Sequence, residues 1–167
     1  MKLILLRHAK AEPFESEQTD MDRRLEPAGR RRAWANAQAL ARLDVAPDIA
    51  LVSPAARTVE TWETVEPVLG GRMQTVPALY HASPAAIMAA VAEAAKPEIS
   101  LMVVGHNPGL HDLALNLARA GDAPREVLTG LASGFPTASA AVFDWSQKTD
   151  QPSFLALIVK GRTLTAD

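Results

Sequence analysis

The sequence predicts a three-layer α/β/α fold with a mostly parallel central sheet and a small cap. Three short runs of consecutive apolar residues are typical of strands buried on both faces: Leu3–Leu6, Ile49–Val52 and Ile99–Val104. The segments between these runs carry apolar or small residues at helical spacing. Alternating strands and helices favour parallel strands whose crossover helices cover both faces of a sheet.

Proline and glycine mark the ends of the expected helices. Pro27 suits a first helical turn, Ser53-Pro54 is expected to cap the helix that follows it, and Ser83-Pro84 is expected to begin another helix. Pro67 and the pair Gly70-Gly71 are expected to end the second helix. The expected helices cover about residues 27–41, 55–67, 84–96 and 110–118.

The rest of the chain is expected to hold further strands and two irregular stretches. An edge strand is predicted near Met73–Leu79, and two closing strands at Ala138–Asp144 and Phe154–Lys160, joined by a polar turn at 147–152. Residues 9–26 and 121–136 are predicted to be irregular and to form the cap, which is short for a lid over a small metabolite. Without repeats or a linker, residues 1–167 are predicted to form one domain.

Composition narrows the function classes. The 167 residues are 48% hydrophobic and carry a net charge of -2, which gives no electrostatic reason to bind nucleic acid or a membrane surface. The absence of cysteine excludes disulfides, thiolate catalysis and Cys-ligated zinc. Arg7 interrupts the first apolar run, which is too short for a signal-peptide core or a membrane span. We therefore expect a cytoplasmic protein, and a monomer.

Histidine and arginine follow the three buried strands. Arg7 and His8 end the first strand, Arg57 lies one helical turn after the second, and His106 follows the third. Ligands of open α/β sheets bind outside the carboxyl ends of the strands. Singly, each such residue is more often structural or simply solvated. Together they predict an anion-binding active site at one edge of the sheet.

This combination of side chains suits phosphoryl transfer. Arginine presents a planar fork of donors that matches phosphate oxygens and stays charged at physiological pH. A neutral imidazole can act as a nucleophile, and a second histidine can donate a hydrogen bond to the transferred group. Such positioning and charge stabilisation are most of what phosphoryl transfer requires.

Four segments resemble, in order, motifs of the histidine phosphatase superfamily, the group that contains phosphoglycerate mutases and acid phosphatases. Segment 3–9 (LILLRHA) is similar to its Arg-His signature, although Ala9 stands where glycine is usual. Segment 20–29 resembles the Asp-x-x-Arg-Pro-Leu-Thr motif of the small SixA-type phosphohistidine phosphatases, with Arg24 and Glu26 in place of Pro and Thr. Segments 53–61 (SPAARTVET) and 104–109 (VGHNPG) match the motifs of the second arginine and second histidine.

The resemblance runs from residue 3 to about residue 143 and implies a role for each matched position. It implies that His8 is the phosphorylated nucleophile, and that Arg7, Arg57 and His106 complete the phosphate pocket. Asp20 and Arg23 would flank that pocket, the arginine as an anion contact and the aspartate as its orienter. The resemblance also implies a phosphoglycerate mutase-like fold, no cofactor and no metal.

The substrate depends on the proton donor. Ester phosphatases of this superfamily usually place a carboxylic acid at the position of segment 79–82 (LYHA), which holds none here. A labile P–N bond needs a donor less, which favours a protein-borne phosphohistidine over a small phosphate ester. His81 is one substitute donor, and it can equally be an exposed loop residue. Other loop carboxylates that could reach inward are Glu12, Asp20 and Asp22.

Three alternatives stay open from the sequence. One is a phosphomonoesterase or mutase for small phosphates, and another is a non-catalytic module that binds phosphorylated proteins. A histidine metal site is disfavoured because arginines beside the histidines would repel a cation. Arg30–Arg32 is a candidate basic docking patch, and His111 and Asp112 lie close enough in sequence to His106 to approach the pocket, although a cap or surface role suits them better.

Overall fold

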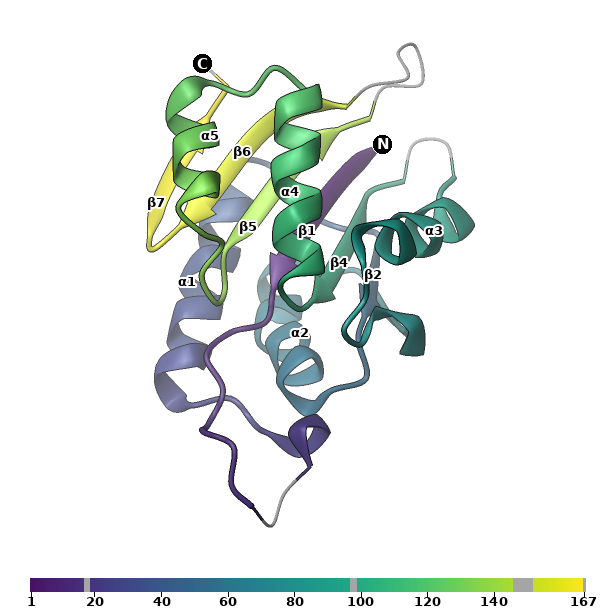
Figure 1. Cartoon of the computed structure of the whole chain (residues 1–167), viewed down its shortest axis with the longest axis vertical. Coiled ribbons are helices and arrows are strands. Elements are labelled where there is room, and N and C mark those ends of the chain that lie inside the picture. The colour runs from purple at the N-terminus through teal and green to yellow at the C-terminus, as the bar shows by residue number, and fades with distance from the viewer. Residues whose placement is uncertain (17–18, 97–98, 146–151, 167) are drawn as a thin grey trace.

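The computed structural model describes residues 1–16, 19–96, 99–145 and 152–166. Its described residues form one sheet of seven strands in the order β3-β2-β4-β1-β5-β6-β7 (Figure 1). The strands are β1 (Lys2–Arg7), β2 (Ile49–Val52), β3 (Arg72–Thr75), β4 (Leu101–Gly105), β5 (Ala140–Asp144), β6 (Ser153–Val159) and β7 (Arg162–Thr165). The α-helices are α1 (Pro27–Arg42), α2 (Ala56–Leu69), α3 (Pro84–Ala94), α4 (Gly109–Ala120) and α5 (Arg125–Ala132).

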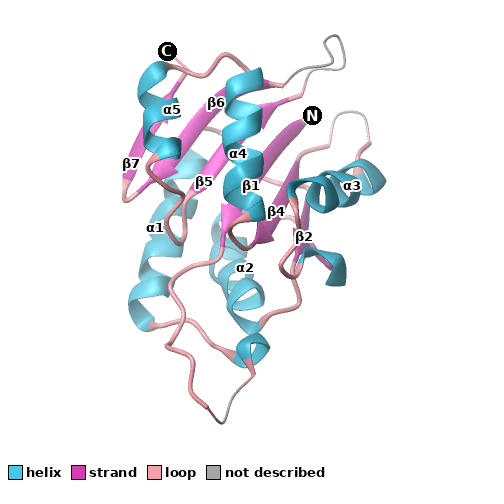
Figure 2. Ribbon diagram, in the orientation of Figure 1, coloured by secondary structure: helices cyan, strands magenta, loops and turns pink. Residues whose placement is uncertain are grey.

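Helices cover both faces of the sheet, as the sequence predicts. Helices α3, α4 and α5 lie on one face, and α1 and α2 on the other (Figure 2). Strand β1 is buried between these layers: Leu3 and Leu5 belong to the core under α3–α5, whereas Ile4 and Leu6 belong to the core under α1 and α2. A strand buried on both faces has consecutive apolar residues, which explains the apolar run Leu3–Leu6 in the sequence of β1.

The sheet is less parallel than expected. Strands β3, β2, β4 and β1 pair in parallel, but β5 pairs antiparallel with β1, and the pairs β5–β6 and β6–β7 are antiparallel. The sequence did not indicate β7, because its residues RTLT contain no apolar run and lie mostly exposed at the sheet edge. Most of the predicted turn, residues 147–151, lies outside the described residues.

Two further expectations need correction. The stretch 121–136 is not irregular, because α5 occupies its centre and buries Val127 and Leu131, one helical turn apart. Ser53 is not a helix cap: α2 begins at Ala56 and has no side-chain cap, and the hydroxyl of Ser53 has another partner. Helix α3 begins at Pro84, as expected, and Ser83 caps it, since its Oγ accepts the backbone N–H of Ala86 at 3.2 Å.

Helix boundaries differ at one proline. Helix α2 continues through Pro67 and ends at Leu69, so only the glycine pair stops it, with Gly70 at a φ of 68°. The edge strand β3 ends at Thr75, and a 3₁₀ turn, Pro77–Leu79, replaces the rest of that predicted strand. In the part of the chain that the structure describes, no helix has both the length and the apolar character of a membrane span.

Candidate active site

Three parallel strands end side by side and bring the predicted residues together. Strand β4 lies between β1 and β2, with Arg7 paired to Gly105 and Val52 paired to Val104. The backbone N–H of His8 donates to the carbonyl of Gly105 at 3.0 Å, which continues this pairing beyond the strand ends. A pocket of about 370 Å³ opens here, lined by Arg7, His8, Lys10, Ala11, Asp20, Arg23, Arg57, His81, His106, Asn107 and Thr137.

The ring of His8 is held as a neutral imidazole of defined tautomer. Its Nδ1 lies 2.8 Å from the backbone carbonyl oxygen of Ala9. A carbonyl only accepts, so Nδ1 carries the proton and Nε2 carries a lone pair. The pKa of His8 is lowered to about 4, mainly by burial and also by the charges of Arg57, Arg7 and Arg23, against the opposing effect of the Ala9 hydrogen bond. A neutral ring at physiological pH is the form that can attack phosphorus.

His106 faces His8, with ring centroids 5.2 Å apart. Its Nε2 lies 2.8 Å from Oγ of Ser53, and its Nδ1 lies 3.3 Å from Nη2 of Arg57. Because guanidinium only donates, Nδ1 accepts and Nε2–H donates to the serine. The pKa of His106 is lowered to about 3, mainly by burial and also by the charges of His8 and Arg57, so this ring is neutral as well.

Arg7 is fixed at the base of the pocket. Its Nη1 donates to the carbonyl of Phe135 at 2.8 Å, and burial lowers its pKa. The same carbonyl accepts Nδ2 of Asn107 at 3.0 Å. Nε of Arg7 is buried and has no hydrogen-bond partner among the described residues. A buried N–H without a hydrogen-bond acceptor lowers the stability of the protein, and an oxygen of a bound oxyanion would supply that acceptor.

Asp20 binds two of the arginines that line the pocket. Its carboxylate accepts Nη2 of Arg57 at 2.8 Å, Nη1 of Arg23 at 3.0 Å and the hydroxyl of Tyr80 at 2.7 Å. Burial alone would raise the pKa of Asp20, but the hydrogen bonds from these three side chains outweigh it and hold that pKa well below its usual range. Asp20 is therefore an anion at neutral pH and orients both arginines.

Several contributors were not predicted. Ser53 binds His106 and Tyr80 binds Asp20, and neither residue was expected in the pocket. Thr61 accepts the N–H of Ala9 at 2.9 Å and donates to the carbonyl of Arg57 at 2.6 Å, so it connects the loop after β1 to α2. These contacts join residues far apart in sequence, which local patterns do not reveal.

The other candidate residues divide clearly. His81 lines the pocket, 3.8 Å from the carboxylate of Asp20, with its side chain 60% exposed. Glu12 and Asp22 are exposed and do not line the pocket. His111 also stays outside it: its Nε2 donates to the carbonyl of Leu131 at 2.6 Å, and Asp112 is exposed. In the predicted basic patch Arg30–Arg32, Arg30 forms an ion pair with Glu60 at 2.7 Å, so its charge contributes to an intramolecular contact.

Comparison with known proteins decides the family. The model of the histidine phosphatase superfamily (branch 1) matches residues 3–107, well over half of the chain. The chain belongs to the histidine phosphatase superfamily. Membership confirms the family predicted from the sequence, and a phosphatase is the enzyme class that it supports.

Similar proteins include two solved structures and one plant sequence. A structure assigned as the phosphohistidine phosphatase SixA of Agrobacterium tumefaciens is 28% identical with a TM-score of 0.79, over 95% of this chain and 97% of that one. The SixA assigned in Nakamurella multipartitia is 30% identical with a TM-score of 0.72, over 85% and 83%. An uncharacterized chloroplastic protein of Arabidopsis thaliana is 34% identical over 71% of this chain. That match spans 60% of the plant protein's length.

Proposed function

We propose that this chain is a phosphatase in which Nε2 of His8 takes up the phosphoryl group, and that its substrate is a phosphohistidine in another protein. The observation that carries the proposal is the ring of His8, whose proton is held on Nδ1 by the Ala9 carbonyl and whose pKa is about 4. This ring exposes a neutral nucleophilic nitrogen in a pocket of arginines.

In the first step, the lone pair on Nε2 of His8 forms a bond to phosphorus while the bond from phosphorus to the substrate nitrogen breaks. The electron pair of the broken bond stays on the substrate imidazole, which takes up a proton from solvent. Arg7 and Arg57 bind the equatorial oxygens and neutralise their charge without a metal ion. The Nδ1–H bond to Ala9 persists and stabilises the positive ring of phosphorylated His8.

His106 requires a change of tautomer to assist. When phosphoryl oxygens take the N–H groups of Arg57, Nδ1 of His106 no longer has to accept from that guanidinium. The hydroxyl of Ser53 can donate to Nε2 as readily as it accepts from it, so the ring proton can lie on Nδ1 and point to the phosphoryl group. In the second step, water attacks phosphorus and the bond between phosphorus and Nε2 of His8 breaks, with its electron pair returning to that nitrogen. Inorganic phosphate and a proton are released to solvent.

The leaving group follows from the acids in the pocket. Among the described residues that line it, Asp20 is the one carboxylic acid, and its lowered pKa keeps it ionised. An ionised carboxylate cannot protonate a leaving alkoxide, and general acid catalysis is worth roughly 10²–10⁴-fold to an ester. A phosphohistidine tolerates this loss because its P–N bond is labile. This supports phosphohistidine over stable phosphate esters.

Turnover of small phosphates is the second candidate, and His81 favours it. Its imidazole lines the pocket and can act as a proton donor in place of a carboxylic acid. A module that binds phosphate without turnover is a third candidate, but it gives no reason for the nucleophilic tautomer of His8.

The test compares a phosphohistidine peptide with p-nitrophenyl phosphate, both in chelator. We expect the peptide to be hydrolysed with the higher kcat/KM. We also expect an acid-labile, alkali-stable phosphoryl label on the wild-type enzyme and none on His8→Ala. Preferential hydrolysis of the aryl ester would reject the substrate, and His8→Ala with near-normal turnover would reject the mechanism.

A further inference from the structure

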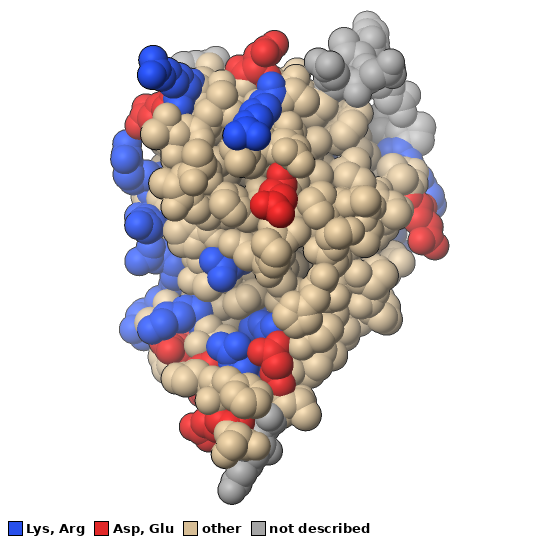
Figure 3. Space-filling view, in the orientation of Figure 1, with Lys and Arg blue, Asp and Glu red and all other residues tan. Residues whose placement is uncertain are grey.

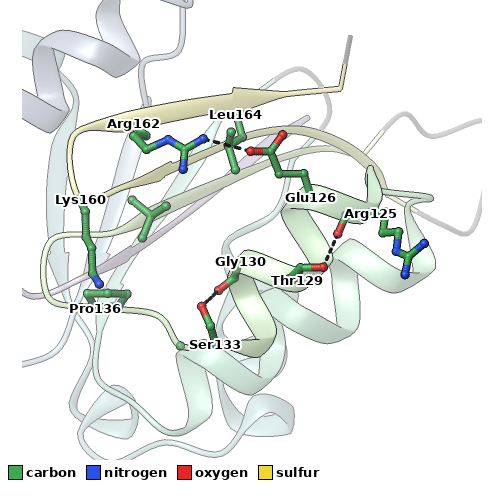
Figure 4. Close-up of a pocket in the computed structure, with 11 residues that line it drawn as sticks. Arg125, Glu126, Thr129, Gly130, Ser133, Pro136, Lys160, Arg162 and Leu164 are labelled. Carbon is green, nitrogen blue, oxygen red and sulfur yellow. Dashed lines mark hydrogen bonds and ion pairs between the residues drawn. The ribbon is translucent and has the colours of Figure 1, made fainter.

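A second cavity of about 630 Å³ lies between α5 and the β6–β7 hairpin (Figure 4). We call it the hairpin groove. Its apolar lining comes from Pro136, Val159 and Leu164. Its volume is within the range of roughly 300–1,000 Å³ typical of ligand pockets. The remaining lining residues are Arg125, Glu126, Thr129, Gly130, Ser133, Gly134, Lys160 and Arg162.

The hairpin groove is basic although the chain is slightly acidic. Arg125, Lys160 and Arg162 line it, and among the described lining residues Glu126 is the one acid. Glu126 binds Arg162 at 3.0 Å and so offsets one of the three positive charges. A dashed line in Figure 4 marks this ion pair. Basic side chains also gather along the neighbouring edge of the molecule, over β7 and α1 (Figure 3). With a net charge of -2 for the whole chain, this is a local concentration of positive charge.

The hairpin groove is next to the catalytic pocket. Pro136 lines the groove and Thr137, the next residue, lines the pocket of His8. The residue before them, Phe135, supplies the carbonyl that holds Arg7. One short segment therefore separates the two cavities. A chain that places its phosphorylated side chain at His8 can continue into the groove.

We propose that the hairpin groove binds an acidic segment of the phosphorylated protein, close in sequence to its phosphohistidine. This rests on the proposed function. The apolar floor and the flanking cations suit a peptide that carries both apolar and carboxylate side chains. A single small anion fits less well, because the cations are spread over α5 and the hairpin, and isolated exposed charges bind weakly. The groove thus selects protein substrates by charge.

The test uses two synthetic peptides that each carry one phosphohistidine. In one the flanking residues are glutamate, and in the other they are serine. For the wild type we expect kcat/KM to be about tenfold higher for the glutamate peptide at low ionic strength, the lower end of electrostatic steering effects. We expect the preference to shrink to about twofold or less at about 0.5 M NaCl, because salt screens exposed charges.

Two variants alter the groove in different ways. Arg125→Gln/Lys160→Gln/Arg162→Gln removes its positive charge, and Thr129→Trp fills it without changing charge. Both should lose the preference for the glutamate peptide and keep the wild-type kcat/KM for the serine peptide, which also shows that they fold. The matched control neutralises three exposed cations outside the groove, Arg42, Arg72 and Lys96, and should keep the preference.

The outcomes separate the two proposals. Equal hydrolysis of both peptides by the wild type would overturn the role of the groove and leave the proposed function standing. A preference that survives in both groove variants, or that is lost equally in the control, would also overturn it. Hydrolysis of neither peptide would overturn both the proposed function and the docking that rests on it.

Discussion

The ionisation of His8 gives the sharpest test of the site. The perturbation is a fall in pH from 7 to 5.5. With a pKa of about 4, about 97% of His8 stays neutral at pH 5.5, whereas an ordinary histidine with a pKa of 6.5 would be about 9% neutral. Burial is the main cause of this difference, and nearby arginines add to it. The population of the nucleophilic form therefore differs by about tenfold between the two cases.

The assay is a long-range ¹H–¹⁵N correlation spectrum of the histidine rings, recorded from pH 8 to 4. It reports the pKa and the tautomer together, because protonated and unprotonated ring nitrogens have different shifts. His8→Asn assigns the signal. We expect His8 to show a proton on Nδ1 and a lone pair on Nε2 throughout the upper range. Titration near pH 6.5, or a proton on Nε2, would refute the reasoning from burial and from the Ala9 carbonyl.

The same pKa has a consequence for stability. The folded state binds a proton on His8 less readily than the unfolded state. The contribution of His8 to the free energy of unfolding is therefore complete above pH 6.5 and is lost as the pH falls to about 4. The difference between these pKa values corresponds to about 3 kcal/mol. Urea unfolding of the wild type and His8→Asn at pH 7 and 4.5 measures it, since the variant should lose less stability between the two pH values.

Three further predictions concern the residues that support the site. Gly29→Ala would place a Cβ in steric overlap with the carbonyl oxygen of Lys10 and should lower the free energy of unfolding by about 1–3 kcal/mol, measured as a lower Tm. The control Gly130→Ala, whose Cβ would meet Leu157 at 3.8 Å, should leave Tm nearly unchanged. Ser53→Ala should lower kcat about tenfold with KM nearly unchanged, and Ser53→Thr should restore it; equal effects of both would argue against the tautomer change. Glu60→Gln should destabilise the protein by about 1–3 kcal/mol in thermal unfolding, because buried Glu60 accepts the N–H of Leu25 at 2.7 Å and binds two arginines.

The sequence located the pocket because its main residues follow directly from strand order. Arg7, His8 and His106 end two strands whose apolar runs are unmistakable, and carboxyl ends of neighbouring parallel strands meet. What it did not reveal depends on contacts between distant side chains. Tyr80 and Asp20 are 60 positions apart, and nothing local to either predicts their hydrogen bond.

The missed elements have local physical reasons. Helix α5 is short and buries only Val127 and Leu131, too few apolar positions to stand out in a polar stretch. Ser53 resembles a helix cap because serine before proline often is one, but its hydroxyl forms a hydrogen bond with His106, which follows another strand. The helix was missed because its local signal is weak, whereas at Ser53 a tertiary contact overrode a local preference.

The hydrogen bond that selects the tautomer of His8 has an unusual relation to mutation. Its acceptor is the backbone carbonyl of Ala9, so no amino-acid substitution at residue 9 removes the accepting oxygen itself. Scanning mutagenesis would therefore overlook the group that decides which ring nitrogen is free to react. Because donor and acceptor belong to adjacent residues, the tautomer of the His8 ring is set within a single dipeptide, and the sheet needs only to place that dipeptide at the pocket.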